Sequence, residues 1–214
     1  MRSIISRIAV TVALAAAAAL AGAQSPPIAG RDYLVIDAPQ PVSPGATVEV
    51  IEFFYYGCPV CYESQPHIAR WLANSGADVS LKRVPSAFTA ESESYALTFY
   101  ALQAGGRLAQ LHGPVYENHH FDERRLSEEK NLLDWLARNG VDAEAFRAQR
   151  DAEGNRARVA EGRGIFEAYD VKGVPAFAVD GRYLTSARLA NGVKEMMDVV
   201  EYLVGRVREE RFKK

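Results

Sequence analysis

The sequence predicts an α/β fold in which an all-helical insertion separates the two halves of the domain. A strand segment, a helical segment and a second strand segment follow one another over residues 47–84, and a strand pair and a long helix return near the C-terminus. The stretch between them has helical character throughout. In addition, 48% of the 214 residues are hydrophobic and no charge-rich tract interrupts them. These features are typical of one compact domain built from a sheet covered by helices.

The N-terminus carries the pattern of an export signal. Arg2 and Arg7 precede an uncharged, alanine-rich stretch that ends in the small residues Ala21-Gly22-Ala23. This pattern predicts a secretory signal peptide at residues 1–23, with cleavage before Gln24. A transmembrane anchor is the alternative, but the stretch is short, and alanine favours the bilayer less than leucine or isoleucine does.

The charge of the mature chain argues against a nucleic-acid-binding protein. The full sequence has 25 Lys and Arg and 27 Asp and Glu. Removing the signal peptide takes away two arginines and no acid, so 23 basic side chains face 27 acidic ones, a formal charge of −4. A protein that binds phosphate backbones needs a basic field instead.

The first half of the mature chain alternates between strand and helix. A proline-rich lead-in at residues 24–46 contains one apolar run, 33–37, which we expect to form an edge strand. The run TVEVIEFF at 47–54 predicts a buried strand. Helical spacing of apolar residues predicts a helix from Cys58 to about Asn74, and DVSLKRV at 78–84 predicts the next strand.

The second half begins with helices and ends with a hairpin and one more helix. Residues 175–179 and 182–186 are strand segments separated by Asp180-Gly181, a pair typical of tight hairpin turns. The last segment, 190–214, places its apolar residues on one helical face. Ser127 is expected to open one of the preceding helices. The helices expected before the hairpin span residues 91–106, 127–140, 142–154 and 158–173.

These elements divide the chain into consecutive parts. The signal peptide and lead-in come first, and the helical insertion lies between the two parts of the α/β domain. The boundaries we expect are 1–23 for the signal peptide, 24–46 for the lead-in, 47–88 for the first part, 89–155 for the insertion and 156–214 for the second part.

The two cysteines, Cys58 and Cys61, lie three residues apart where the first long strand meets the first helix. Cys58 stands at the helix start, where unpaired backbone N–H groups and the positive end of the helix dipole favour a thiolate. Cys61 lies one turn inside the helix. This spacing predicts an exchangeable disulfide with one attacking and one resolving sulfur.

Two other interpretations of the cysteine pair remain open at this point. A purely structural disulfide is common in exported proteins, although so short a loop removes little entropy from the unfolded chain. A zinc site normally needs four ligands, and the chain has no second cysteine pair and no histidines at ligand spacing, so we expect no metal.

The motifs resemble those of a known family. The sequence CPVC after an aromatic strand, VKGVPAF at 171–177 and the helical block between the two halves resemble the thioredoxin superfamily and, within it, the DsbA family of periplasmic thiol oxidases. The resemblance covers about residues 33–210. It implies a thioredoxin-like fold with the helical insertion, a periplasmic location and no cofactor.

The resemblance also implies roles for the residues around the thiols. It makes Cys58 the exposed nucleophile and Cys61 its buried partner. An acidic residue six positions before the first cysteine is typical of the family, which implies that Glu52 is buried near Cys61 and carries its proton. The alternative is that Glu52 faces solvent from the other side of the strand.

The substrate-binding residues implied by the resemblance flank the cysteines and face them. Pro59 and Val60 lie between the thiols, and Val174-Pro175 forms the facing loop, with Pro175 cis. The best-known oxidases of the family carry histidine where this chain has Val60. Valine donates no hydrogen bond to the Cys58 thiolate, so we expect a less acidic Cys58 and a milder oxidant.

The predicted function is that of a thiol:disulfide oxidoreductase. The resemblance implies that it donates its disulfide to newly exported, reduced proteins and is reoxidised by a DsbB-type, quinone-linked membrane partner; we expect a monomer. One alternative is a disulfide isomerase or reductase kept in the dithiol form. Another is a non-catalytic module that binds unfolded chains and carries a structural disulfide.

Overall fold

The computed structural model describes residues 25–42, 45 and 47–212. The signal peptide expected at residues 1–23 lies outside the described residues. Among the residues that are described, no helix is both long enough and apolar enough to cross a lipid bilayer.

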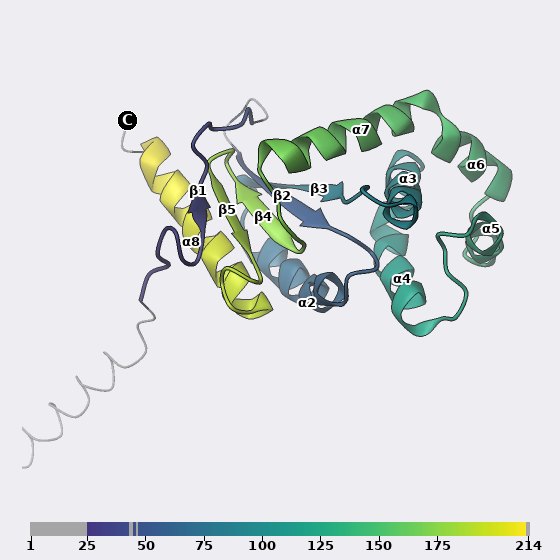
Figure 1. The fold of residues 1–214 in the computed structure, drawn as a ribbon, viewed down its shortest axis with the longest axis horizontal. Helices are drawn as coiled ribbons and strands as arrows, with labels where there is room; N and C mark the ends of the chain where they lie inside the picture. The colour runs from purple at the N-terminus through teal and green to yellow at the C-terminus, as the bar shows by residue number, and fades with distance from the viewer. Residues whose placement is uncertain (1–24, 43–44, 46, 213–214) are drawn as a thin grey trace, which may run out of the picture.

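A five-stranded mixed sheet forms the centre of the α/β part (Figure 1). Its strand order is β1-β5-β4-β2-β3. The central strand β2 pairs in parallel with β3 and antiparallel with β4, and β1 and β4 flank β5 in antiparallel pairs. The strands are β1 (Leu34–Val35), β2 (Val48–Phe54), β3 (Val79–Pro85), β4 (Ala176–Val179) and β5 (Tyr183–Ser186).

The predicted hairpin is the β4–β5 pair. Its turn residues Asp180 and Gly181 both have positive φ angles, 53° and 69°, as a two-residue hairpin turn of the right twist requires. A Cβ atom at Gly181 would lie 2.1 Å from the carbonyl oxygen of Gln40. Glycine at this position therefore allows the lead-in to run closely past the hairpin.

Helices cover both faces of the sheet. Successive residues of a strand point to opposite faces, so Val50 packs against α2 (Pro59–Asn74) and α8 (Val193–Phe212), whereas Phe53, three residues on, packs against α7 (Glu153–Ala168). The apolar face predicted for the C-terminal helix is buried. The core of the α/β part is therefore two apolar layers with the sheet between them.

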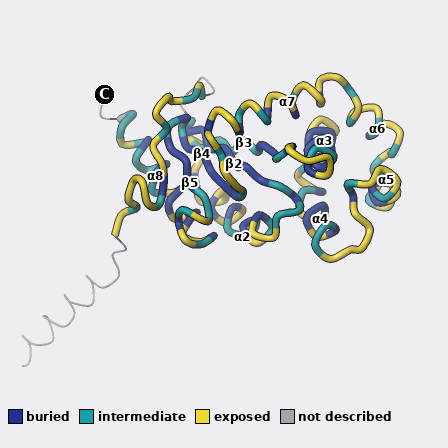
Figure 2. The backbone as a smooth tube through the Cα atoms, viewed as in Figure 1, coloured by how far each residue is buried: buried dark blue, intermediate teal, exposed yellow. Residues whose placement is uncertain are grey.

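The helical insertion forms a separate block beyond the β3 edge of the sheet, as Figure 1 shows. Its core contains the aromatic residues Phe99 and Tyr116 and also includes Phe54, Tyr56 and Cys61 from the α/β part. Figure 2 shows α3 as the most deeply buried helix of the block. The block consists of α3 (Ala90–Ala104), α4 (Leu108–Phe121), α5 (Glu129–Arg138) and α6 (Ala143–Asp151).

Three details of the helical region differ from the sequence expectations. The helix α4 was not among the helices expected from the sequence, and it continues through Pro114 in its interior. The helix α5 begins at Glu129 rather than at Ser127 and has no side-chain N-cap. The helix α7 starts at Glu153, so the boundary proposed between residues 155 and 156 falls inside its first turn.

Candidate active site

Cys58 is the N-cap residue of α2. Its backbone is extended, with φ −90° and ψ 116°, and Pro59 follows as a first-turn residue whose missing N–H would have no helical partner there. The sulfur of Cys58 accepts a hydrogen bond from the backbone N–H of Cys61, with an N···S distance of 3.3 Å. The local sequence therefore aims the Cys58 sulfur at the helix N-terminus.

The two thiols are free, and their environments shift their pKa values in opposite directions. Hydrogen bonds from the Cys61 thiol and from the backbone N–H groups of Cys61 and Val60 lower the pKa of Cys58 to about 7, against an opposing effect of burial. Cys61 is 0% exposed, and burial and the neighbouring Cys58 raise its pKa well above the usual range. At neutral pH, Cys58 is therefore the more readily ionised thiol.

The loop before β4 faces the first cysteine. The Val174–Pro175 bond is cis, as the resemblance implied. The Cys58 thiol donates a hydrogen bond to the Val174 carbonyl oxygen at 3.5 Å, although 116 residues separate the two in sequence. Val174 precedes the first residue of β4, so its backbone lies outside the strand pairing.

Glu52 lies inside the protein. Its side chain is 0% exposed, so the alternative that it faces solvent is wrong. Burial raises the pKa of Glu52, against the opposing effects of Arg83 and Gln65. The negative charge of Glu52 in turn contributes to the raised pKa of Cys61. Glu52 can therefore hold a proton near the buried thiol.

The sequence analysis did not identify the two partners of Glu52. Arg83 Nε donates to one carboxylate oxygen at 2.7 Å, and Gln65 Nε2 donates to the other at 3.1 Å. The register of β2 and β3 sets Glu52 directly opposite Arg83. The sequence did contain a signal for this pairing. Glu52 lies four residues after the start of β2, and Arg83 lies four residues after the start of β3.

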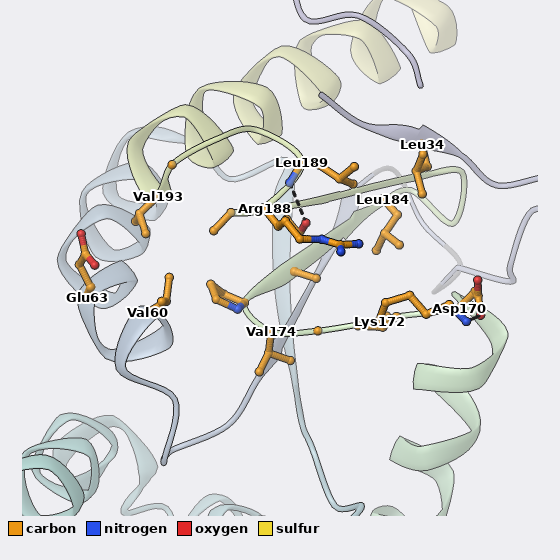
Figure 3. Close-up of a pocket in the computed structure, with 17 residues that line it drawn as sticks. Leu34, Val60, Glu63, Asp170, Lys172, Val174, Leu184, Arg188, Leu189 and Val193 are labelled. Atoms are coloured by element: carbon orange, nitrogen blue, oxygen red, sulfur yellow. Dashed lines mark hydrogen bonds and ion pairs between the residues drawn. The ribbon is translucent and has the colours of Figure 1, made fainter. Parts of the chain in front are cut away.

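An apolar groove with a volume of about 580 Å³ lies beside the thiols. Figure 3 shows Val60 and Val193 near one end and Leu34 and Leu184 toward the other. Val174 and Pro175 line the groove between these ends, and Val60 is 38% exposed. Three of the four predicted substrate-binding residues therefore line one groove, and the fourth, Pro59, adjoins it in the chain.

Three of the four histidines, His112, His119 and His120, lie in α4 of the helical block, and His67 lies in α2. His112 Nδ1 lies 2.7 Å from the Tyr56 hydroxyl, and burial, together with the charge of Arg83, lowers its pKa to about 3. Within the described part of the chain, no three His, Cys, Asp or Glu side chains are grouped so as to hold a metal ion.

The geometry and the fold together define a class of protein. Two thiols one helical turn apart can pass between the dithiol and the disulfide state, and the more acidic one is accessible from solvent. On a thioredoxin-like sheet and opposite a cis-proline, such a pair is characteristic of the thiol:disulfide oxidoreductases.

Comparison with known proteins identifies the family. A family model described as a DSBA-like thioredoxin domain matches residues 63–204, and the chain belongs to this family. The chain is 32% identical over 212 residues to the thiol:disulfide interchange protein DsbA of Burkholderia cepacia, covering 99% of this chain and 100% of that protein. It is 36% identical over 175 residues to DsbA of Bordetella pertussis, covering 81% and 83%. The crystal structure of Pseudomonas aeruginosa DsbA is similar with a TM-score of 0.83 at 31% identity, covering 88% of this chain and 97% of that chain.

These comparisons confirm the predicted fold, family and enzyme class. The protein is a thiol:disulfide oxidoreductase with a thioredoxin-like fold and a helical insertion. The relatives are named for disulfide interchange, which does not favour the non-catalytic binding module or the reductive alternative.

Proposed function

We propose that this oxidoreductase is an oxidase that donates the Cys58–Cys61 disulfide to cysteine pairs of newly exported proteins. The observation that carries this proposal is the contrast between the two thiols. The pKa of Cys58 is lowered to about 7, whereas burial raises that of Cys61. An environment that stabilises the Cys58 thiolate favours the reduced enzyme, and an enzyme that favours its reduced form gives its disulfide away.

The reaction proceeds in two exchanges. A substrate thiolate attacks the Cys58 sulfur, the Cys58–Cys61 bond breaks, and Cys61 leaves with the bonding electron pair and takes up a proton. A second substrate thiolate then attacks the substrate sulfur of the mixed disulfide. Cys58 leaves as a thiolate, so the substrate is oxidised by two electrons and the enzyme is reduced by two.

Three neighbouring features support these steps. Glu52, whose pKa is raised by burial, supplies the proton to Cys61. The backbone of Val174, ahead of Pro175, holds an extended substrate segment close to Cys58. Pro59 and Val60 form the wall beside the attacked sulfur, where Val60 contributes apolar surface to the groove.

The cycle closes with reoxidation of the dithiol. A DsbB-type membrane protein that passes electrons to a quinone is the partner expected from the family relationship, and the enzyme itself needs no cofactor. The N-terminal pattern of Arg2, Arg7 and a short apolar stretch supports export to the periplasm. We expect the enzyme to act there as a monomer on unfolded or reduced proteins.

The test compares thermal unfolding of the oxidised and reduced enzyme at pH 7.5, together with oxidation of a reduced, unfolded ribonuclease. We expect the reduced form to melt higher, since the Cys58 thiolate stabilises it. The Cys58→Ser and Cys61→Ser variants should each lose all oxidation activity, because neither can form the disulfide that the enzyme donates. A higher melting temperature of the oxidised form would overturn the oxidase assignment. If the native protein does not oxidise the ribonuclease, and the Cys58→Ser, Cys61→Ser double variant binds the unfolded ribonuclease as tightly as the native protein does, the protein acts by binding alone.

A further inference from the structure

Tyr55 contacts both cysteines through its backbone. Its carbonyl oxygen accepts a hydrogen bond from the backbone N–H of Cys58, with an N···O distance of 3.0 Å. Burial raises the pKa of Cys61, and a backbone hydrogen bond from Tyr55 acts in the opposite direction. The position of the Tyr55 backbone therefore affects the start of α2 and the environment of the buried sulfur.

The side chain of Tyr55 is attached to the helical insertion. Its hydroxyl donates a hydrogen bond to Glu91 Oε2 at 2.8 Å, and Glu91 lies in the first turn of α3. The Tyr55 ring also meets the rings of Tyr95 and His119 edge to face, each with a centroid separation of 6.2 Å. Burial and the charge of Glu91 raise the pKa of Tyr55, so the hydroxyl keeps its proton and remains a donor.

Gly57 leaves the space that the Tyr55 ring occupies. A Cβ atom at Gly57 would lie 2.4 to 2.5 Å from ring atoms of Tyr55 and from its hydroxyl oxygen. The φ angle of Gly57 is not in the left-handed region, so an alanine there would meet no backbone obstacle. The residue before Cys58 is therefore restricted to glycine by the position of one side chain.

We propose that Tyr55 is a positioning residue of the dithiol centre. The hydrogen bond to Glu91 holds the Tyr55 side chain against the insertion, and the Tyr55 backbone aligns Cys58 with the N-terminus of α2. The helical insertion then acts on the redox chemistry through one hydrogen bond, in addition to packing against Phe54, Tyr56 and Cys61. This inference rests on the roles proposed for Cys58 and Cys61, but its test does not depend on the direction of electron flow.

The first experiment measures the Cys58 thiolate by absorbance at 240 nm across pH, and the equilibrium of the full chain with glutathione. We expect Tyr55→Phe and Glu91→Ala each to raise the pKa of Cys58 by about 0.4 to 1 unit, the equivalent of one hydrogen bond of ordinary net strength. The equilibrium constant for reduction of the enzyme by glutathione falls about two- to tenfold, because the thiolate loses stabilisation.

Glu93→Ala is the matched control, because it removes the same side chain and charge from the same first turn of α3, where Glu93 pairs with Arg163. It should leave the Cys58 pKa unchanged. The proposal is overturned if Tyr55→Phe leaves the thiolate midpoint and the glutathione equilibrium at their native values. Equal losses of melting temperature in both redox forms, without a change in either quantity, would mark Tyr55 as purely structural.

A second experiment uses Gly57→Ala in two backgrounds. In the native background the new methyl group displaces the Tyr55 ring from Glu91 and raises the Cys58 pKa. In the Tyr55→Ala background the obstacle is gone, and Gly57→Ala should change the pKa little. Gly164→Ala, at a helical glycine whose Cβ would meet open space, is the control for an added methyl group. An equal change of the Cys58 pKa by Gly57→Ala in both backgrounds would contradict the positioning role of Tyr55.

This result is distinguishable from failure of the proposed function. If the oxidised form melts higher than the reduced form but the pKa changes follow the Gly57 and Tyr55 pattern, the oxidase assignment fails and the positioning role stands. If the reduced form melts higher but the pKa changes do not follow the Gly57 and Tyr55 pattern, the oxidase assignment stands and the positioning role of Tyr55 fails.

Discussion

The residue between Pro59 and Cys61 offers a direct test of how the Cys58 thiolate is stabilised. Val60 follows Pro59 in the first turn of α2, 38% exposed, and its backbone N–H already lowers the pKa of Cys58. Changing Val60→His adds a side-chain donor at this position. A hydrogen bond to a charged group contributes about 1.5–3 kcal/mol, and partial exposure reduces this to about 1.4 kcal/mol.

This free energy predicts the size of two measurable changes. Since one pKa unit corresponds to 1.36 kcal/mol, the pKa of Cys58 should fall from about 7 by about one unit. The same stabilisation of the reduced form should raise the reduction potential by about 30 mV. The first change is read from thiolate absorbance across pH, and the second from equilibration with glutathione.

Val60→Leu is the control for this substitution, because it keeps an apolar side chain in the groove and adds no donor. It should change neither quantity. A Cys58 pKa that stays near 7 or rises in Val60→His would refute the reasoning that a missing donor at position 60 makes this enzyme a milder oxidant.

Three further predictions follow from the same geometry. Because Cys58 is deprotonated in the folded dithiol form but protonated in the unfolded chain between about pH 7 and pH 9, the stability of the reduced form relative to the oxidised form should rise with pH across that window. The gain is up to about 1–2 kcal/mol after allowance for partial exposure, and it is lost as pH falls through 7. Above about pH 9 the rise should end, because Cys61 keeps its proton in the folded form but loses it in the unfolded chain; paired calorimetric melts can check both parts. Glu52→Gln removes the proton carrier beside Cys61. It should slow ribonuclease oxidation by about tenfold or more and leave the Cys58 pKa unchanged. Oxidation at the native rate would exclude the proton-transfer role of Glu52. Leu132 is 0% exposed in the core of the insertion, so Leu132→Ala should lower the free energy of unfolding by about 2–5 kcal/mol in both redox forms. Urea titrations measure this loss, and a loss confined to one redox form would contradict the prediction.

The elements predicted from local patterns match the structure where the pattern is continuous. The strand segment 47–54 corresponds to β2 (Val48–Phe54), and the hairpin turns at Asp180 and Gly181 as predicted, although Arg182, expected in the second strand, also lies in the turn. The sequence analysis missed α4, for which no helix was expected. This helix continues through Pro114, and its residues Leu111, Val115 and Tyr116 are buried in the core of the insertion, so tertiary packing stabilises it.

The sequence alone was enough to identify the two sulfurs and their place at a helix start, because each of these depends on residues close together in the chain. The burial of Glu52 and its pairing with Arg83 depended on strand register and on the packing of α2, which no local pattern specifies. The same holds for the contact of Tyr55 with Glu91, 36 residues apart. The acidity of a thiol is set by groups within a few ångströms, and only folding brings these distant groups to the sulfur.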